Sequence, residues 1–257
     1  MNLNPQKRPD ISLVMPCYNE ETTIVKTAPA LVSSFLKEKI DLQLILVNNG
    51  SKDGTEKIID QLISLGMPIE KVNIPINEGY GNGILEGLRR CRGHYVGFLC
   101  ADGQVAPQDV VQVFRLAQGN HHPSLAKVRR KFRPDGLVRK VVSICFNGLI
   151  SCIFFGLHSL DINGNPKIFP YETLQLLMLI SKNWFLDAEI MIKAKVLKIP
   201  VVEMNVRGRL RQGGKSHVRV QTSIEFFKSI YQYRLGHPIK QWQEDLEDGK
   251  RWDDHLF

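Results

Sequence analysis

The strongest constraint on the fold is a regular alternation of strand and helix signals over the first 120 residues. Short apolar runs such as 42–47 (LQLILV) are typical of strands that are covered on both faces. The expected strands are residues 11–15, 42–47, 71–76 and 95–99, and the expected helices are residues 20–37, 53–65 and 79–90. This order predicts the α/β class, a mostly parallel twisted sheet with helices on both faces.

A polar cluster follows each expected strand directly. The clusters are Tyr18-Asn19-Glu20, Asn48-Asn49, Asn77-Glu78-Gly79 and Asp102-Gly103-Gln104. Open α/β sheets bind ligands at the carboxyl ends of their strands, so we expect these side chains to line one crevice. Taken singly, each cluster has a plainer interpretation, because Asn-Gly and Asp-Gly are ordinary turn sequences and Asp102 could merely cap the helix after Pro107.

Length, charge and cysteine content limit the classes of protein to which this chain can belong. A chain of 257 residues forms one good-sized domain or two small ones. Its net charge of +8 suits a phosphate-bearing partner, which could be a nucleotide, a nucleic acid or an anionic membrane face. Five cysteines without C-x-x-C spacing favour a reducing compartment, and the polar N-terminus favours the cytoplasm.

The apolar stretch 141–157 is a candidate membrane span. It has the minimum length for crossing a bilayer, about 17 residues, and polar residues interrupt it. We therefore expect no transmembrane segment, but a helix that is buried or lies in the membrane interface. The preceding segment 127–140 carries seven basic residues against one acid, which favours docking to an anionic leaflet. A solvated basic face beside a core helix is the alternative.

Together with later motifs, the clusters resemble those of the family-two inverting glycosyltransferases with the GT-A fold, in particular the polyprenyl-phosphate (dolichyl-phosphate) sugar transferase group. The matching motifs are P-C-Y-N-E at 16–20, V-N-N-G-S-K-D-G-T at 47–55, N-E-G-Y-G-N-G at 77–83, A-D-G-Q at 101–104, D-I-N-G-N-P-K at 161–167, F-L-D-A-E at 185–189 and G-K-S-H at 214–217. We expect a single GT-A catalytic domain at 1–235, with a nucleotide-binding half at about 10–120 and an acceptor half at about 121–235, and then a polar C-terminal tail at 236–257.

The resemblance implies that the donor is a nucleoside-diphosphate sugar. The residues that would bind it are Pro16, Tyr18, Glu20, Asn48, Asn49, Gly79, Gly81, Ala101 and Asp102. Relatives usually carry acids where this chain has Asn48 and Asn49. Amides both donate and accept hydrogen bonds, so the exchange could alter the preference for the base.

The metal motif departs from the family pattern, which is Asp-x-Asp with a Gln two residues later. Cys100 replaces the first acid, while Asp102 and Gln104 are retained. Mg²⁺ commonly takes one or two protein carboxylates and completes its shell with phosphates and waters, whereas a neutral thiol suits it poorly. We expect Asp102 and Gln104 to hold Mg²⁺ or Mn²⁺ and Cys100 to be a bystander. An inactive relative is the alternative.

The resemblance further implies roles in catalysis and in acceptor binding. The expected catalytic residues are Asp102, Asp187 and Arg209, and the expected acceptor or phosphate contacts are Lys127, Arg129, Arg139, Arg211, Lys215 and Ser216. A lipid phosphate is already anionic and needs no strong base, so Asp187 or Glu189 would orient the acceptor. A helix N-cap is the alternative for Asp187. The basic segment 207–217 is expected to close over the donor.

The sequence thus predicts an enzyme that moves a sugar, with inversion, from a nucleoside-diphosphate sugar to a dolichyl or undecaprenyl phosphate. It would act peripherally at the cytosolic membrane face, where a membrane-anchoring protein could be its partner. The main alternative is a transferase of the same fold that builds a glycan on a sugar hydroxyl. A nucleic-acid-binding protein is disfavoured, because aromatic residues do not alternate with the basic ones in a recognisable binding module.

Overall fold

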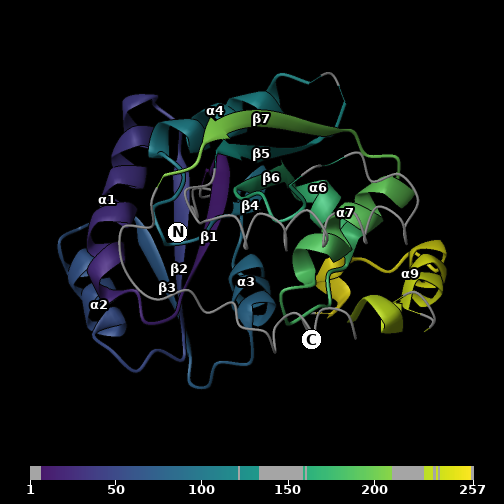
Figure 1. Ribbon diagram of the computed structural model, residues 1–257, viewed down its shortest axis with the longest axis horizontal. Helices are drawn as coiled ribbons and strands as arrows, with labels where there is room; N and C mark the ends of the chain where they lie inside the picture. Colours follow the sequence, from purple (N-terminus) through teal and green to yellow (C-terminus); the bar gives the residue numbers. More distant parts are fainter. Residues whose placement is uncertain are drawn as a thin grey trace, which may run out of the picture.

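The computed structural model describes residues 7–120, 122–132, 159, 161–209, 229–233, 236 and 238–255. Within them, a seven-stranded sheet has the order β3-β2-β1-β4-β6-β5-β7. The strands are β1 (Ile11–Cys17), β2 (Leu42–Asn49), β3 (Ile69–Ile74), β4 (Tyr95–Phe98), β5 (Leu125–Phe132), β6 (Lys167–Pro170) and β7 (Val201–Arg207). The predicted α/β class is confirmed, and the sheet runs through the molecule between two layers of helices (Figure 1).

The first four strands are parallel, and β1 lies between β2 and β4. Alternate residues of β1 face opposite sides of the sheet. Leu13 and Met15 pack with α1 (Glu21–Lys37), α2 (Thr55–Ser64) and α4 (Pro107–Gln118), whereas Val14 packs with α3 (Tyr80–Leu88). All of β2 is buried, which explains its near-continuous apolar run.

The third strand ends two residues earlier than the sequence predicted, at Ile74 rather than Ile76. Pro75 follows, and a proline lacks the N–H that a sheet requires. Ile76 is therefore exposed in the turn that leads to α3.

The second half of the sheet is mixed. Strand β6 is antiparallel to both β4 and β5, and β7 is parallel to β5. Helices α6 (Tyr171–Leu177) and α7 (Leu186–Val196) join α3 on its face of the sheet, where their apolar residues share one core cluster. Consequently α3, α6 and α7 form one layer on this face of the sheet.

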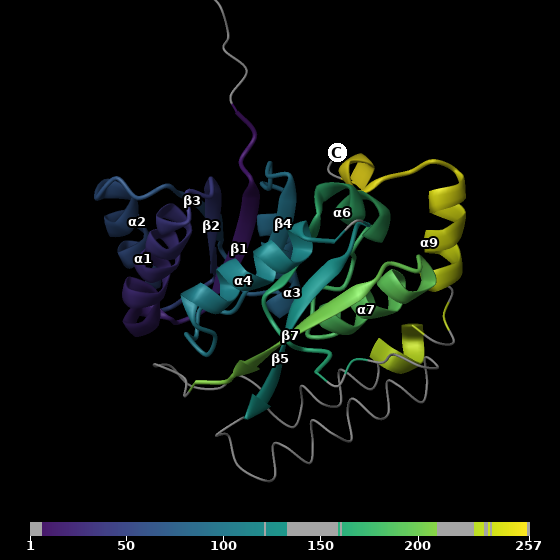
Figure 2. The same cartoon turned by 90° about the horizontal axis from the view of Figure 1, so that it is seen from above.

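The segment expected to be a polar tail contains α9 (Pro238–Glu247) and the short 3₁₀-helix η1 (Trp252–His255). Figure 2 shows α9 beside α7, on the side of the molecule remote from α1 and α2. Trp242 of α9 is only 4% exposed, and Trp252 of η1 is only 3% exposed. The indole N–H of Trp242 donates to the Leu176 carbonyl at 3.0 Å, so this segment packs onto the domain through two aromatic anchors.

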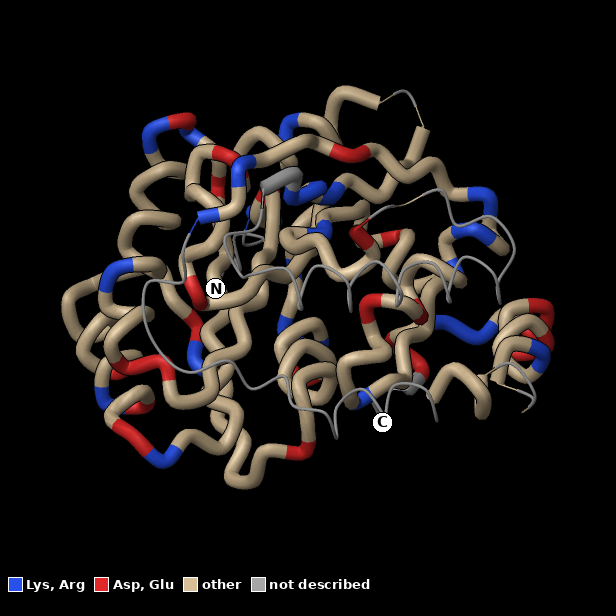
Figure 3. Tube along the Cα trace, in the orientation of Figure 1, with Lys and Arg blue, Asp and Glu red and all other residues tan. Residues whose placement is uncertain are grey.

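Across the described part of the chain, no helix is both long and apolar enough to cross a membrane. The stretch 141–157 lies outside the described residues, as does most of the basic segment before it. In the view of Figure 3, the lysines and arginines of the described residues are interspersed with acids along the helices.

Candidate functional site

The polar clusters after β1 and β2 meet at the carboxyl edge of the sheet, as the sequence predicted. The side-chain oxygen of Asn19 accepts a hydrogen bond from the Lys52 N–H at 2.8 Å. The Glu20 N–H donates to the Thr55 hydroxyl at 2.9 Å. These two bonds tie the start of α1 to the start of α2, so Pro16, Tyr18 and Glu20 lie next to the end of β2.

Asn48 and Asn49 point to opposite sides of β2. The Asn48 amide donates to the Asn73 side-chain oxygen at 2.6 Å, and the Asn49 amide donates to the Gly79 carbonyl at 3.0 Å. A carboxylate could make neither bond, so replacing acids by amides here changes how the edge is held together. The buried Oδ1 of Asn49 accepts no hydrogen bond from the described residues.

Residues 77–82 are the loop before α3 and the first residues of that helix. We call them the donor turn, after the prediction that Gly79 and Gly81 contact the donor. They pack backbone against backbone with residues 181–183. Gly79 has a φ of +125°, and a β-carbon there would collide with the Lys182 carbonyl. At Gly81 a β-carbon would collide with the Ser181 carbonyl. The Asn82 N–H donates to the Lys182 carbonyl at 2.8 Å. Glycine is therefore required at both positions.

Asp102 lies in a tight turn after β4. One of its carboxylate oxygens accepts the Gln104 N–H at 3.1 Å, and Gly103 has a φ of +68°. The Arg209 N–H donates to the Gln104 carbonyl at 3.0 Å. The main chain thus brings Asp102, Gln104 and Arg209 together, although they come from opposite halves of the sheet.

Cys100 stands where the family's first metal-binding acid was expected. Burial, with the carboxylates of Asp102 and Asp187 nearby, raises the pKa of its thiol to about 12. The thiol is therefore neutral near pH 7, whereas a metal binds the thiolate. No group of three or more His, Cys, Asp or Glu side chains among the described residues could hold a metal. A divalent cation here would be shared between Asp102, the side-chain oxygen of Gln104 and substrate phosphates.

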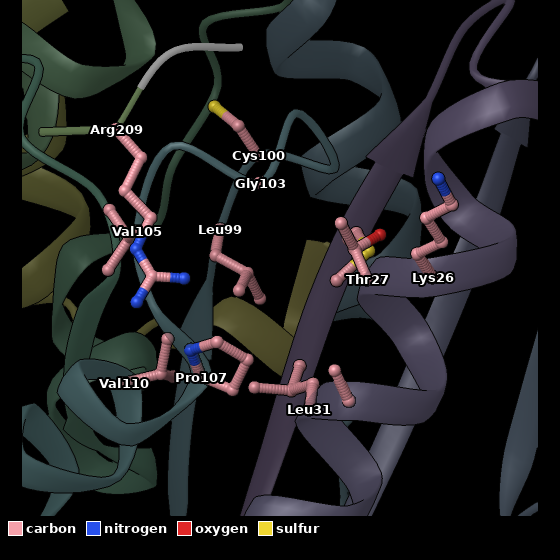
Figure 4. Close-up of a pocket in the computed structure, with 12 residues that line it drawn as sticks. Lys26, Thr27, Leu31, Leu99, Cys100, Gly103, Val105, Pro107, Val110 and Arg209 are labelled. Carbon is pink, nitrogen blue, oxygen red and sulfur yellow. The ribbon is translucent and has the colours of Figure 1, made fainter. Parts of the chain in front are cut away.

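A pocket of about 180 Å³ opens beside the Asp102 turn, between α1 and the start of α4 (Figure 4). Its walls are mainly apolar, formed by Met15, Leu31, Leu99, Val105, Pro107 and Val110. Lys26, Thr27 and Arg209 supply the polar groups, and no acid of the described residues lines it. In Figure 4, the side chain of Arg209 extends past Val105 towards Pro107.

The placement of Lys127 corrects the expectation that it contacts a substrate phosphate. Its side chain is 0% exposed, and its ammonium group lies 3.0 Å from a Glu203 carboxylate oxygen and donates to the Asp161 carbonyl at 2.6 Å. Lys127 lies inside β5 and points inward, which its place in a run of basic residues does not reveal. Burial, with Lys167 nearby, lowers the pKa of Lys127 to about 8.

Arg130, which the sequence did not single out, fixes the loop that carries the D-I-N-G motif. Its guanidinium group donates to both carboxylate oxygens of Asp161, at 2.9 and 3.0 Å, and to the Asn163 carbonyl at 2.9 Å. Arg129 is half-buried beside it. The remaining expected phosphate contacts, Arg139, Arg211, Lys215 and Ser216, lie outside the described residues.

Both candidate acceptor-side acids are buried in ion pairs. Asp187 pairs with Lys167, and Glu189 pairs with Lys193 at 2.7 Å. The helix N-cap interpretation of Asp187 is wrong, because Phe185 is the N-cap of α7. A paired carboxylate suits orientation of a neighbour better than removal of a proton.

Sequence reasoning also missed Tyr80, Trp184 and Asn165. The rings of Tyr80 and Trp184 stack with centroids 4.2 Å apart, and the Asn165 amide donates to the Tyr80 hydroxyl at 3.0 Å. Burial, with Asp187 nearby, raises the pKa of Tyr80 well above its usual value. Tyr80 and Asn165 lie within the motifs at 77–83 and 161–167, and this position was the sequence signal that could have identified them.

Comparison with known proteins bears on the family and the fold of this chain. Residues 12–191 match glycosyl transferase family 2. The chain is 26% identical over 249 residues to dolichyl-phosphate beta-glucosyltransferase ALG5A of Trichomonas vaginalis, covering 91% of this chain and 75% of that protein. It is 25% identical over 265 residues to the dolichyl-phosphate beta-glucosyltransferase of Dictyostelium discoideum, covering 94% and 79%.

Among solved structures, glucosyl-3-phosphoglycerate synthase from Mycobacterium tuberculosis, crystallised with Mg²⁺ and uridine diphosphate, is similar with a TM-score of 0.70. The identity is 18%, and the match covers 89% of this chain and 80% of that one. This likeness confirms the predicted GT-A fold, and the family match confirms the predicted enzyme class.

The thiol of Cys100 should alkylate slowly. Its pKa of about 12, against an ordinary value of 9.0, lowers the thiolate population at about pH 8 by about a thousandfold. Iodoacetamide labelling followed by mass spectrometry of the Cys100 peptide would measure the rate, with urea-unfolded protein as the control. Equal rates in folded and unfolded protein would contradict a raised pKa.

The stabilising contribution of Lys127 should increase at alkaline pH. Its pKa is about 8 in the folded protein and near 10.5 in the unfolded chain, so between these values the unfolded chain binds more protons. The free energy of unfolding should therefore rise with pH across this window, relative to Lys127→Met, by on the order of 3 kcal/mol. Urea unfolding of both proteins at several pH values would measure the difference. Parallel curves would show that the pKa of Lys127 is not lowered.

Proposed function

The chain belongs to glycosyl transferase family 2, and we propose that it transfers a sugar, with inversion, from a nucleoside-diphosphate sugar to a polyprenyl phosphate. The observation that carries the choice of acceptor is the pairing of both α7 acids, Asp187 with Lys167 and Glu189 with Lys193. A hydroxyl acceptor needs a base, whereas a phosphate acceptor is already a nucleophile. The names of the two dolichyl-phosphate relatives support the same acceptor class.

The donor would bind across the carboxyl edge of β1 and β2. The base and ribose would contact the first two polar clusters, where the buried Oδ1 of Asn49 has no hydrogen-bond partner among the described residues. The donor turn would lie beside them, because Asn49 is bonded to Gly79. The stacked rings of Tyr80 and Trp184 give this side of the site a rigid wall.

The diphosphate would lie at Asp102. A bound Mg²⁺ or Mn²⁺, held by the Asp102 carboxylate and the side-chain oxygen of Gln104, would stabilise the negative charge of the leaving nucleotide. The turn fixes Asp102 in place before the substrate arrives. Arg209, attached through its backbone to the same turn, would add a cation.

The pocket beside the Asp102 turn supports an amphipathic acceptor. Its apolar walls suit an isoprenoid, and Lys26 and Arg209 suit a phosphate. Whole-ligand pockets are commonly about 300–1,000 Å³, so this one would accept only the isoprene units next to the phosphate. Attachment to the cytosolic membrane face, or to a membrane-anchoring protein, stays a prediction of the sequence.

Replacing Asp102 tests the metal and leaving-group role. We expect Asp102→Asn to lower kcat by at least about a hundredfold, because it removes the one protein carboxylate of the shell. Turnover of UDP-, GDP- and dTDP-sugars would be measured during Mn²⁺ titration. Asp109→Asn, in the first turn of α4, is the matched control. Unchanged turnover in Asp102→Asn would remove this residue from the mechanism, and a wild type that turns over no donor would favour the inactive relative.

Filling the pocket tests the acceptor. With the best donor of that panel, wild type should glycosylate citronellyl phosphate but not citronellol or a soluble glycan. Ala30→Phe should raise the KM for citronellyl phosphate at least tenfold and leave the donor KM unchanged, because Ala30 lines the pocket. Ser33→Phe, on the same helix but not in the pocket lining, should change neither. Transfer to citronellol or the glycan would favour the hydroxyl-acceptor alternative.

A further inference from the structure

We propose that α9 positions the donor turn through a buried chain of contacts formed by Trp242, the Glu189–Lys193 ion pair and residues 178–183. This inference rests on the proposed function, because it takes the donor turn as part of the donor site. Helix α9 lies outside residues 12–191, the part of the chain that matches the family. The inference therefore assigns a positioning role in donor binding to a C-terminal segment that the family match leaves out.

The first link joins the donor turn to residues 178–183. Gly79 and Gly81 face the carbonyls of Lys182 and Ser181 so closely that no β-carbon fits between the two backbones. The Asn82 N–H donates to the Lys182 carbonyl at 2.8 Å. A displacement of residues 181–182 therefore either displaces the donor turn or opens a gap behind it.

The second link joins residues 178–183 to α7. This segment contains no helix or strand, so its backbone groups need partners from elsewhere. The carboxylate of Glu189, 0% exposed, accepts the Ser181 N–H at 2.9 Å and the Ile180 N–H at 3.2 Å. Lys193 donates to the Met178 carbonyl at 2.8 Å. One buried ion pair thus holds residues 178, 180 and 181 of the segment.

The third link joins that ion pair to α9. The ammonium group of Lys193 lies 5.1 Å from the ring centroid of Trp242, within the range of a cation–π contact. The indole N–H of Trp242 donates to the Leu176 carbonyl, one residue before the end of α6. Trp242 therefore covers Lys193 and is itself fixed to the helix that leads into residues 178–183.

The energetics explain why Trp242 affects the donor turn as well as stability. A buried ion pair keeps one geometry only while both charges are shielded and all their hydrogen bonds are made. A smaller residue at 242 admits water to Lys193, which weakens its hold on Met178 and the hold of Glu189 on Ile180 and Ser181. The effect then reaches Gly79 and Gly81 through the backbone contact.

The chain offers a matched control in Trp252. It is as buried as Trp242 and lies in the same C-terminal segment. However, the hydrogen bonds of η1 go to α6, where Asp253 accepts from the Tyr171 hydroxyl at 3.0 Å and donates its N–H to the Gln175 side chain at 3.2 Å. Replacing Trp252 removes a comparable aromatic group without uncovering Lys193.

The kinetic experiment compares Trp242→Leu with Trp252→Leu in the full chain. Its substrates are citronellyl phosphate and the best donor of the panel of UDP-, GDP- and dTDP-sugars. Trp242→Leu should raise the donor KM at least fivefold and leave the KM for citronellyl phosphate within twofold of wild type. Trp242→Phe keeps a ring over Lys193 and should restore most of the donor affinity. Trp252→Leu should lower the Tm to a similar extent but leave the donor KM within twofold. Equal donor KM changes in the two leucine variants would overturn the proposal.

A second measurement does not depend on activity. Hydrogen–deuterium exchange should accelerate at 178–183 and 77–83 in Trp242→Leu but not in Trp252→Leu. Lys193→Met, which keeps the apolar stem, should give the same pattern if Trp242→Leu does not fold. If the wild type used no donor while the exchange pattern appeared, the proposed function would fail and the mechanical link would stand. Unchanged exchange at 77–83 in Trp242→Leu and in Lys193→Met would overturn the inference.

Discussion

The pairing of β1 with β2 on one side and β4 on the other is the constraint on which the site depends. Cys17 lies beside Asn48 in this register, and Val14 lies beside Phe98, four residues before Asp102. Parallel strands end at the same edge, so the pairing collects polar groups that are far apart in the sequence. A slip of one residue would turn Asn48 and Asn49 to the wrong sides of the sheet.

Three buried lysines organise the irregular segments around that edge. Lys127 holds the 161–167 loop with Glu203, Lys167 pairs with Asp187, and Lys193 pairs with Glu189. Each pair pays for removal from water with several hydrogen bonds, so the net gain in stability is small. Their effect is on geometry. Each ammonium group donates hydrogen bonds to several fixed oxygens, so the loop that it holds has one arrangement.

The ion pairs between buried lysines and acids also determine which groups can take part in the chemistry. Asp187 and Glu189 are each held by a buried lysine, which suits them to orient neighbouring groups, and the Cys100 thiol stays neutral. Asp102, set in an open turn, is the carboxylate that meets the diphosphate in the proposed mechanism. The division between paired and available acids therefore favours a reaction in which stabilising the leaving group matters more than activating the nucleophile.

The sequence by itself determined the α/β class, the succession of strands and helices in the nucleotide half and the meeting of Asn19, Asn48, Asn49 and Asp102 at one edge, because apolar periodicity and strand-end polarity are local signals. It could not show that Lys127 points inward, that Arg130 grips Asp161, or that Trp242 covers Lys193. Those facts depend on partners distant in the chain, and a basic or aromatic residue looks alike in sequence whether it faces water or a buried acid. Only the tertiary structure decided them, because burial and charge pairing are properties of the packed chain.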